Sequence, residues 1–121
     1  MARTTLIDHK GVQITFLDFA HVQSNEEALR AIEEAGQIVQ AAPFRSVRTL
    51  THVTDSRFNG EVLEAVKRLA ANNRPYVIAG AVVGLSGLQK VVYTTVMRFS
   101  KRSIPAFDNL DAAKDWLVVQ T

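Results

Sequence analysis

The chain of 121 residues contains no cysteine, only six glycines and three prolines, and no long apolar run. The absence of cysteine excludes disulfide bonds and thiol chemistry. The low glycine and proline content excludes collagen-like and low-complexity chains. A bilayer span needs roughly 20 apolar residues, and the opening MARTTLIDHK lacks the apolar core of a signal peptide. We therefore expect a cytoplasmic protein with no membrane span.

A long stretch in the second half of the chain contains no acidic residue. None lies between Glu64 and Asp108, although the formal net charge is only +2. The basic residues of that span are Lys67, Arg68, Arg74, Lys90, Arg98, Lys101 and Arg102. If they converged on one face, their field would favour a phosphate, a nucleic acid or an anionic lipid surface. Basic side chains on helices are more often simply solvated, so we expect no specific nucleic-acid partner.

What the chain does contain is typical of an ordinary globular protein. It is 47% hydrophobic and 21% charged, a balance that supports one hydrophobic core. A chain of this length falls within the usual size of one domain. We therefore expect a single domain that covers residues 1–121.

The first half of the chain predicts a hairpin followed by a helix. Residues 3–9 and 12–19 form two apolar runs on either side of the polar, glycine-containing DHKG, which favours an antiparallel pair of strands. A period near 3.6 residues then begins after Ser24, and Glu27 three residues later completes a capping-box signature. Pro43 ends this helix. Its expected core stripe is Leu29, Ile32, Ala35, Gly36 and Val39.

The second half predicts an alternation of strands and helices. Strands are expected at SVRTLTHVT, at the almost wholly apolar YVIAGAVVGL and at SIPAFD, and helices at EVLEAVKRLAANN, at the segment after Gly87 and at NLDAAKDWLVV. In the second helix the expected core residues are Val62, Leu63, Val66, Leu69 and Ala70. The order β-β-α-β-α-β-α-β-α predicts an α/β fold with a single-layer mixed sheet of about five strands, on which the helices pack.

A glycine-containing turn joins the apolar strand to the third helix. Gly84, Ser86, Gly87 and Lys90 stand where backbone N–H groups at a helix start can bind an anion. The nucleotide motifs are incomplete, because Val91 follows Lys90 where Ser or Thr is required and GLSGLQ lacks a third glycine. The simpler interpretation is that Gly84 permits a tight turn and Ser86 caps the helix. Ser86, Gly87 and Lys90 are the candidate residues for anion or ligand binding.

The third helix has two distinct faces on a helical wheel. A spacing of 100° per residue places the apolar residues on one face, which we expect to pack on the core: Leu88, Val91, Val92, Thr95, Val96 and Phe99. Tyr93 and Met97 lie on the opposite face, with Lys90, Arg98 and Lys101 beside them. We therefore predict a partner interface made of Tyr93, Met97, Arg98 and Lys101.

Polar residues follow the third strand in THVTDSRF. His52, Thr54, Asp55 and Ser56 lie at the carboxyl end of that strand, where ligands gather in open α/β sheets. A serine hydrolase needs its nucleophile on a glycine-flanked elbow, which this serine lacks. The histidines lie in separate elements without zinc-ligand spacing. We therefore predict no enzyme, no metal and no cofactor.

Taken together, these elements resemble a known family. The paired opening strands, the turn TDSRF, the segment AVVGLSGLQKVVYTTVMRFSKR and the terminal AFDNLDAAKDWL are similar to the SpoIIAA-like family, bacterial relatives of the STAS domain of anti-sigma-factor antagonists. The resemblance covers nearly the whole chain and is most specific in the last forty residues. It implies a mixed sheet with about four helices, similar to the lipid-binding CRAL-TRIO proteins.

The resemblance implies regulation rather than catalysis. STAS regulators carry a phosphorylatable serine in an Asp-Ser-Ser-Gly turn; Asp55 and Ser56 match its beginning, whereas Arg57 and Phe58 replace the rest. The first hypothesis is a non-enzymatic interaction module that binds a protein partner or a second copy of itself. The alternative is a carrier of a small anionic or lipid-like ligand, bound between the third helix and the sheet.

Overall fold

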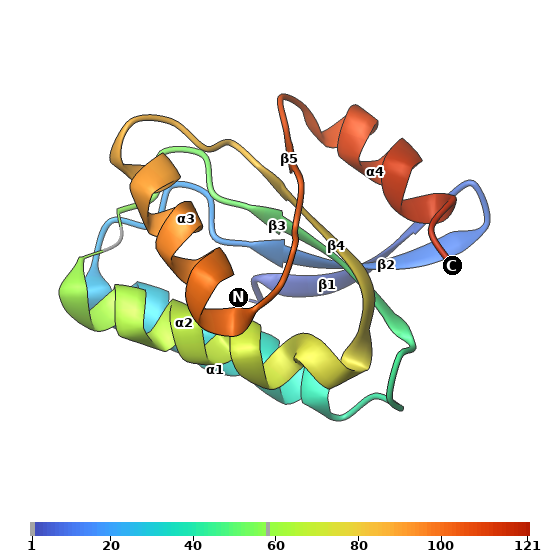
Figure 1. The fold of residues 1–121 in the computed structure, drawn as a ribbon, viewed down its shortest axis with the longest axis horizontal. Helices are drawn as coiled ribbons and strands as arrows, with labels where there is room; N and C mark the ends of the chain where they lie inside the picture. The colour runs from blue at the N-terminus through green and yellow to red at the C-terminus, as the bar shows by residue number, and fades with distance from the viewer. Residues whose placement is uncertain (1, 58) are drawn as a thin grey trace.

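The computed structural model describes residues 2–57 and 59–121 and has the predicted α/β architecture (Figure 1). The strands of its mixed sheet are β1 (Thr4–His9), β2 (Val12–Asp18), β3 (Val47–His52), β4 (Val77–Val83) and β5 (Ala106–Phe107). The helices are α1 (Asn25–Gln40), α2 (Gly60–Asn73), α3 (Leu88–Ser100) and α4 (Leu110–Val118), with a short 3₁₀ turn at Arg74–Tyr76. The predicted order of strands and helices is confirmed.

The five strands follow one another across the sheet in chain order, β1-β2-β3-β4-β5. β1 and β2 pair antiparallel, and every later pair is parallel. Because right-handed crossovers that step in one direction place their helices on the same face, α1, α2 and α3 cover one side of the sheet. α4 follows the last strand and packs on the other side (Figure 1).

The hairpin turn explains the register of the first two strands. Lys10 and Gly11 both have positive φ, 52° and 79°, which is the backbone of a two-residue turn whose twist matches that of the flanking strands. His9 consequently pairs with Val12. Glycine adopts this conformation without steric cost, so the DHKG break forms the turn of the predicted hairpin.

The N-terminus of α1 is fixed by its cap and by an ion pair. The Glu27 backbone N–H donates to Ser24 Oγ at 3.1 Å, which confirms Ser24 as the N-cap. The Glu27 carboxylate is 2.9 Å from the Arg3 guanidinium. The hydrogen bond and charge of Arg3 lower the pKa of Glu27. The start of α1 is thereby tied to the strand that opens the chain.

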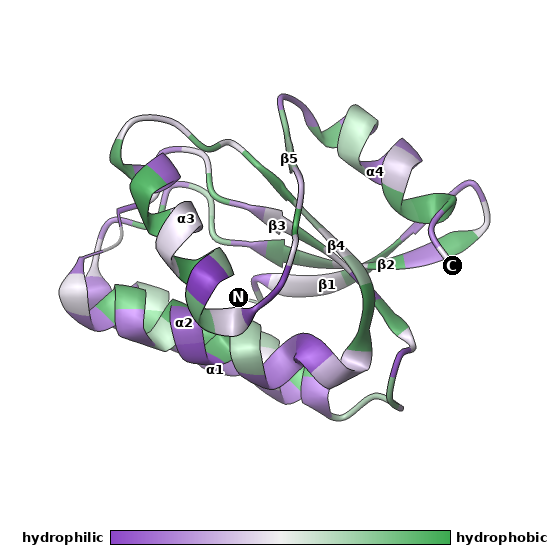
Figure 2. Cartoon of the chain, viewed as in Figure 1, coloured by the Kyte–Doolittle hydropathy of each residue, from purple (hydrophilic) through white to green (hydrophobic). Residues whose placement is uncertain are grey.

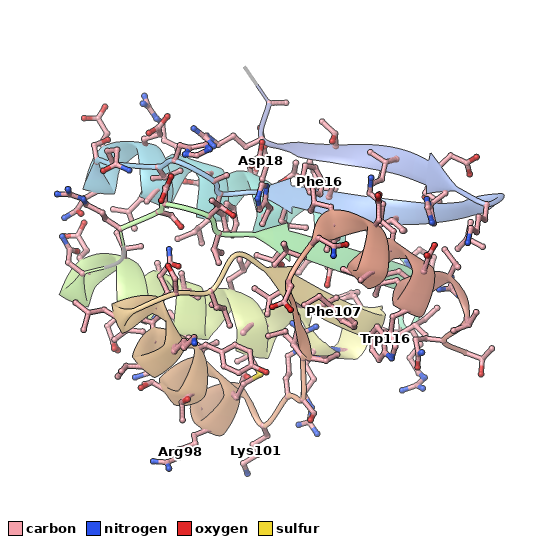
Figure 3. The ribbon with its side chains drawn as sticks, turned by 90° about the horizontal axis from the view of Figure 1, so that it is seen from above. Phe16, Asp18, Arg98, Lys101, Phe107 and Trp116 are labelled. Carbon is pink, nitrogen blue, oxygen red and sulfur yellow. The ribbon has the colours of Figure 1, made fainter. Side chains whose placement is uncertain are left out.

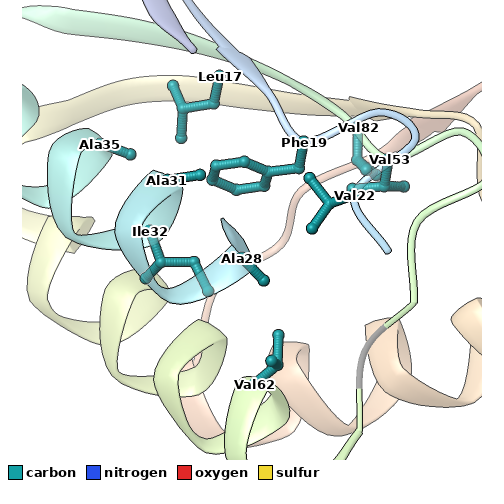
Figure 4. Packing of buried hydrophobic residues seen from close by; sticks show 10 residues of the cluster. All are labelled: Leu17, Phe19, Val22, Ala28, Ala31, Ile32, Ala35, Val53, Val62 and Val82. Atoms are coloured by element: carbon teal, nitrogen blue, oxygen red, sulfur yellow. The ribbon is translucent and has the colours of Figure 1, made fainter. Parts of the chain in front are cut away.

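Two apolar clusters lie on the two faces of the sheet. The larger joins α1 and α2 to the sheet (Figure 4) and comprises Leu17, Phe19, Val22, Ala28, Ala31, Ile32, Ala35, Val53, Val62 and Val82. The smaller joins α4 to the sheet and comprises Ile14, Leu50, Ala81, Val83, Ala113 and Leu117. Hydrophilic residues alternate with apolar ones along α1 and α2 (Figure 2), as expected of helices with one buried face.

The buried stripes of the first two helices differ slightly from the prediction. In α1, Ala28 and Ala31 are buried, whereas the predicted Leu29 and Gly36 are only half-buried. In α2 the buried residues are Val62, Ala70 and Asn73. Small alanines let α1 approach the sheet closely.

None of the helices in the described part of the chain combines the length and the apolar character that a membrane crossing needs.

Candidate functional site

The exposed face of α3 carries apolar residues that the helical wheel predicted to pack on the core. Leu88 is 84% exposed, Val91 64% and Phe99 50%. Of the predicted core face, only Val92 and Val96 line the space between the helix and the sheet. The predicted core face is therefore wrong for the other residues, and the helix is rotated about its axis relative to the prediction.

Tyr93 and Met97 face inward, so the prediction that they form an outer interface is also wrong. The Tyr93 hydroxyl donates a hydrogen bond to the Ile104 carbonyl. The backbone N–H of Ile104 lies 3.4 Å from Met97 Sδ. Both side chains thus hold the segment that leads from α3 to β5 against α3 itself.

A buried glutamine explains the orientation of α3. Gln89 is only 8% exposed, and its Nε2 donates to the carbonyl oxygens of Val53 at 2.7 Å and Ser56 at 2.8 Å. Its Oε1 accepts from the Ser86 backbone N–H at 3.1 Å. A polar side chain can be buried when its hydrogen bonds are made. Hydrogen bonding to the loop after β3 therefore decides which face of α3 points inward.

Beneath α3 lies a cavity of about 90 Å³, bounded by α2, the sheet and the segment 101–105. Its lining is mostly apolar: Leu17, Phe19, Val53, Val66, Leu69, Ala70, Val82, Leu85, Val92, Tyr93, Val96, Met97 and Ile104, with the polar Thr49, Thr51, Asn73, Gln89 and Arg102. Tyr93, Met97, Arg102 and Ile104 are half-buried. The cavity wall on this side is therefore within reach of solvent.

Arg102 is the one charged residue in this lining. Its Nη1 makes only a long hydrogen bond, 3.4 Å, to the Ala70 carbonyl. No ion pair among residues 2–57 and 59–121 includes it. Burial, with a smaller contribution from the charge of Arg74, lowers the pKa of Arg102 to about 10. The guanidinium therefore remains a cation at neutral pH.

A glycine in β4 makes room for this guanidinium. A Cβ on the buried Gly80 would lie 3.0 Å from Arg102 Nη2 and 2.9 Å from Thr49 Oγ1. Thr49 is the neighbour of Gly80 in the sheet and is 4% exposed. The absence of a side chain at Gly80 therefore lets a cation and a hydroxyl meet at the cavity wall.

The predicted anion-binding residues lie elsewhere. Ser86, Gly87 and Lys90 are exposed and are not among the residues of the cavity. Gly84 has φ of 98°, which confirms its role in the turn. The predicted Ser86 cap is wrong, because the N-cap is Gly87 and the Ser86 N–H is instead bonded by Gln89. Lys90 borders a separate depression beside β5.

The predicted phosphorylation turn keeps its serine inside the protein. Ser56 is 7% exposed, and its hydroxyl donates to the Val53 carbonyl at 2.6 Å. Asp55 is exposed, with φ of 55°, and its carboxylate lies 3.4 Å from His21 Nδ1. A kinase would have to open the turn to reach the hydroxyl. Phe58, part of the departure from the STAS pattern, lies outside the described residues.

The charged residues predicted to flank the interface point into solvent. Arg98 and Lys101 are exposed and extend away from the sheet at the end of α3 (Figure 3). They do not converge on the cavity. Of the basic residues in the span without acidic residues, Arg102 is the one that lines it.

The polar cluster after β3 does not form a nucleophile site. His52 Nε2 lies 2.9 Å from Thr54 Oγ1, and His52 Nδ1 lies 3.8 Å from Asp18 Oδ1. The Ser56 hydroxyl bonds to the backbone and to Gln89 instead. Within residues 2–57 and 59–121 no three His, Asp or Glu side chains are grouped as metal ligands would be.

Sequence reasoning missed Thr49 and Arg102, two polar residues of the cavity lining, and Gly80, over which they meet. One signal was available, since a glycine inside an apolar strand often marks a close approach of another group. Nothing in the sequence separated Arg102 from its basic neighbours.

Comparison of the chain with protein-family models, with curated proteins and with solved structures gave no match.

Proposed function

We propose that the protein binds and carries a small, mainly apolar ligand in the cavity beneath α3. The observation that carries this proposal is a cavity of about 90 Å³ with a mainly apolar lining. Protein interiors are normally packed with few voids larger than a water molecule. Concave, mainly apolar spaces with a few polar groups are typical of small-molecule sites.

The surroundings of the cavity support a binding role. One wall is the sheet and another is α2, both of which belong to the main core. The remaining wall is α3 with the segment 101–105, and Tyr93 and Met97 join these two parts at Ile104. Because Tyr93, Met97 and Ile104 are half-buried, a ligand can reach the cavity from this side.

Calorimetric titration with hexanol and octanol tests the proposal, with native mass spectrometry of freshly purified protein as a second measurement. We expect saturable binding of at least one alcohol. Val96→Phe and Leu69→Phe fill the cavity from two walls and should each weaken binding at least about tenfold. Val91→Phe on the exposed face is the matched control and should bind as the wild type does. A wild-type protein that binds neither alcohol contradicts the proposal.

A second candidate, self-association, is supported by the exposed outer face of α3. Leu88, Val91 and Phe99 are large apolar residues on one short helix, and each is at least half exposed. Contiguous exposed apolar residues commonly mark interaction sites. The Lys67 ammonium lies 4.6 Å from the centre of the Phe99 ring. This proposal keeps the predicted interaction module but moves its surface away from Tyr93 and Met97.

Sedimentation velocity over a range of concentrations tests self-association. We expect a dimer that Leu88→Glu combined with Val91→Glu converts to a monomer, whereas Thr94→Glu, also exposed on α3, leaves it dimeric. A wild-type chain that stays monomeric at all concentrations removes this candidate. The resemblance to SpoIIAA-like proteins, and the regulatory role that it implies, stay predictions.

A further inference from the structure

The side chain of Arg102 is a cation against a mostly apolar cavity. It makes one long hydrogen bond, to Ala70, and no ion pair among the described residues. Arg102 is half-buried, and a charge that is partly removed from water is stabilised by an opposite charge beside it. An anion bound in the cavity would supply the missing partner.

Arg102 and Thr49, which both line the cavity, come together over Gly80. A Cβ on Gly80 would lie 3.0 Å from Arg102 Nη2 and 2.9 Å from Thr49 Oγ1, so the two groups can approach each other this closely only beside a glycine. The guanidinium can donate, and so can the threonine hydroxyl. Two donors that meet beside an apolar space fit a ligand with an acidic head and an apolar body.

The number of charges narrows the ligand class. Arg102 is the single charged residue of the lining, which suits one negative charge better than the two of a phosphate monoester. The planar guanidinium fork matches a carboxylate in shape and can bind both of its oxygens. The exposed Arg74 adds positive potential nearby, since its charge lowers the pKa of Arg102.

We infer that the cavity binds a small apolar monocarboxylate, whose carboxylate is bound by Arg102 and Thr49 and whose hydrocarbon part lies against Val82, Val96 and Met97. This inference rests on the proposed carrier function and names the class of its ligand. Because the pKa of Arg102 stays near 10, the cation that binds the carboxylate is present throughout the neutral range.

The test compares matched acids and alcohols: hexanoate with hexanol, and octanoate with octanol. In the wild-type protein the acid should bind more tightly than the alcohol of the same length. Arg102→Gln should weaken binding of the acid about tenfold to a hundredfold, the range of a lost hydrogen bond to a charged group, and should leave the alcohol unchanged. Arg102→Lys keeps the charge but loses the planar guanidinium fork. Its affinity for the acid should therefore lie between those of the wild type and Arg102→Gln.

Two controls make the outcome specific. Arg98→Gln removes an exposed cation from the same region and should change neither affinity. Chemical-shift changes at the amides of Thr49 and Gly80 should accompany binding of the acid. Thermal unfolding shows whether Arg102→Gln has folded. If it has not, the affinity of Arg102→Lys for the acid decides whether Arg102 binds the carboxylate.

The possible results separate the two proposals. If the wild type binds an alcohol but prefers it to the matched acid, the carrier function stands and the carboxylate inference is overturned. The same holds if Arg102→Gln weakens acid and alcohol equally. If the wild type binds neither, the proposed function fails first, and the inference fails with it.

Discussion

A pair of adjacent substitutions on α3 tests the physical reason for its orientation. Gln89→Leu replaces a buried amide with an apolar group of similar volume, and Leu88→Gln makes the opposite change at a position that is 84% exposed. Hydropathy alone predicts that the first change stabilises the protein and the second destabilises it. The hydrogen bonds of Gln89 predict instead that Gln89→Leu destabilises the protein, and the exposure of Leu88 predicts that Leu88→Gln has little effect.

The magnitude follows from the partners that Gln89→Leu leaves behind. The Val53 carbonyl remains bonded by the N–H and hydroxyl of Ser56, and the N–H of Ser86, an exposed residue, can bond to water. The carbonyl of Ser56, a buried residue, loses the bond from the amide. One buried polar group without a partner costs about 1–3 kcal/mol. That is a substantial part of a total stability of about 5–15 kcal/mol.

Urea unfolding followed by circular dichroism measures both changes. Gln89→Leu should lower the free energy of unfolding by about 1–3 kcal/mol and the melting temperature by roughly 3–6 °C for each kcal/mol. Leu88→Gln should stay within about 0.5 kcal/mol of the wild type, as surface substitutions usually do. If Leu88→Gln is the more destabilising of the two, the reasoning about this helix is refuted.

Two further predictions concern the smaller core and the hairpin. Leu50→Ala empties a fully buried position and should cost about 2–5 kcal/mol, whereas Leu6→Ala, at a residue 58% exposed, should change little in the same urea titration. Hydrogen bonds from His9 and then from Lys10 lower the pKa of the Asp115 carboxyl in the folded protein. The ionised carboxylate therefore stabilises the fold above the pKa that Asp115 has in the unfolded chain. This stabilisation is lost as the pH falls through the lower pKa of the folded state. Asp115→Asn should therefore reduce the loss of stability below about pH 4, and an unchanged acid slope in urea midpoints would contradict this.

The sequence predicted the architecture because its signals are local. Ser24 caps α1 whatever the helix packs against, and Gly11 adopts its positive φ within a two-residue turn. The nearly continuous apolar segment at β4 predicted a strand covered on both faces, and it lies between the two clusters. Turn chemistry and periodicity of this kind do not require knowledge of distant residues.

The face of α3 could not be predicted because it depends on distant residues. A helical wheel measures hydropathy, and on that measure Leu88 and Phe99 belong inside while Gln89 belongs outside. The buried amide bonds to carbonyls that are 33 and 36 residues away in the chain. The rotation of the helix therefore followed hydrogen bonds that exist only once the loop after β3 is in place.

By itself, the sequence determined the order of strands and helices, the opening hairpin and the cap of α1, because each depends on neighbouring residues. Only the tertiary structure decided which side of α3 is buried and which basic residue lies at the cavity. Arg102 is one of seven similar cations between Glu64 and Asp108. It differs from the others because its guanidinium lies against Gly80. Gly80 belongs to β4, which precedes α3 in the chain, whereas Arg102 follows α3. Gly80 and Arg102 meet only when the fold brings β4 and the segment after α3 together.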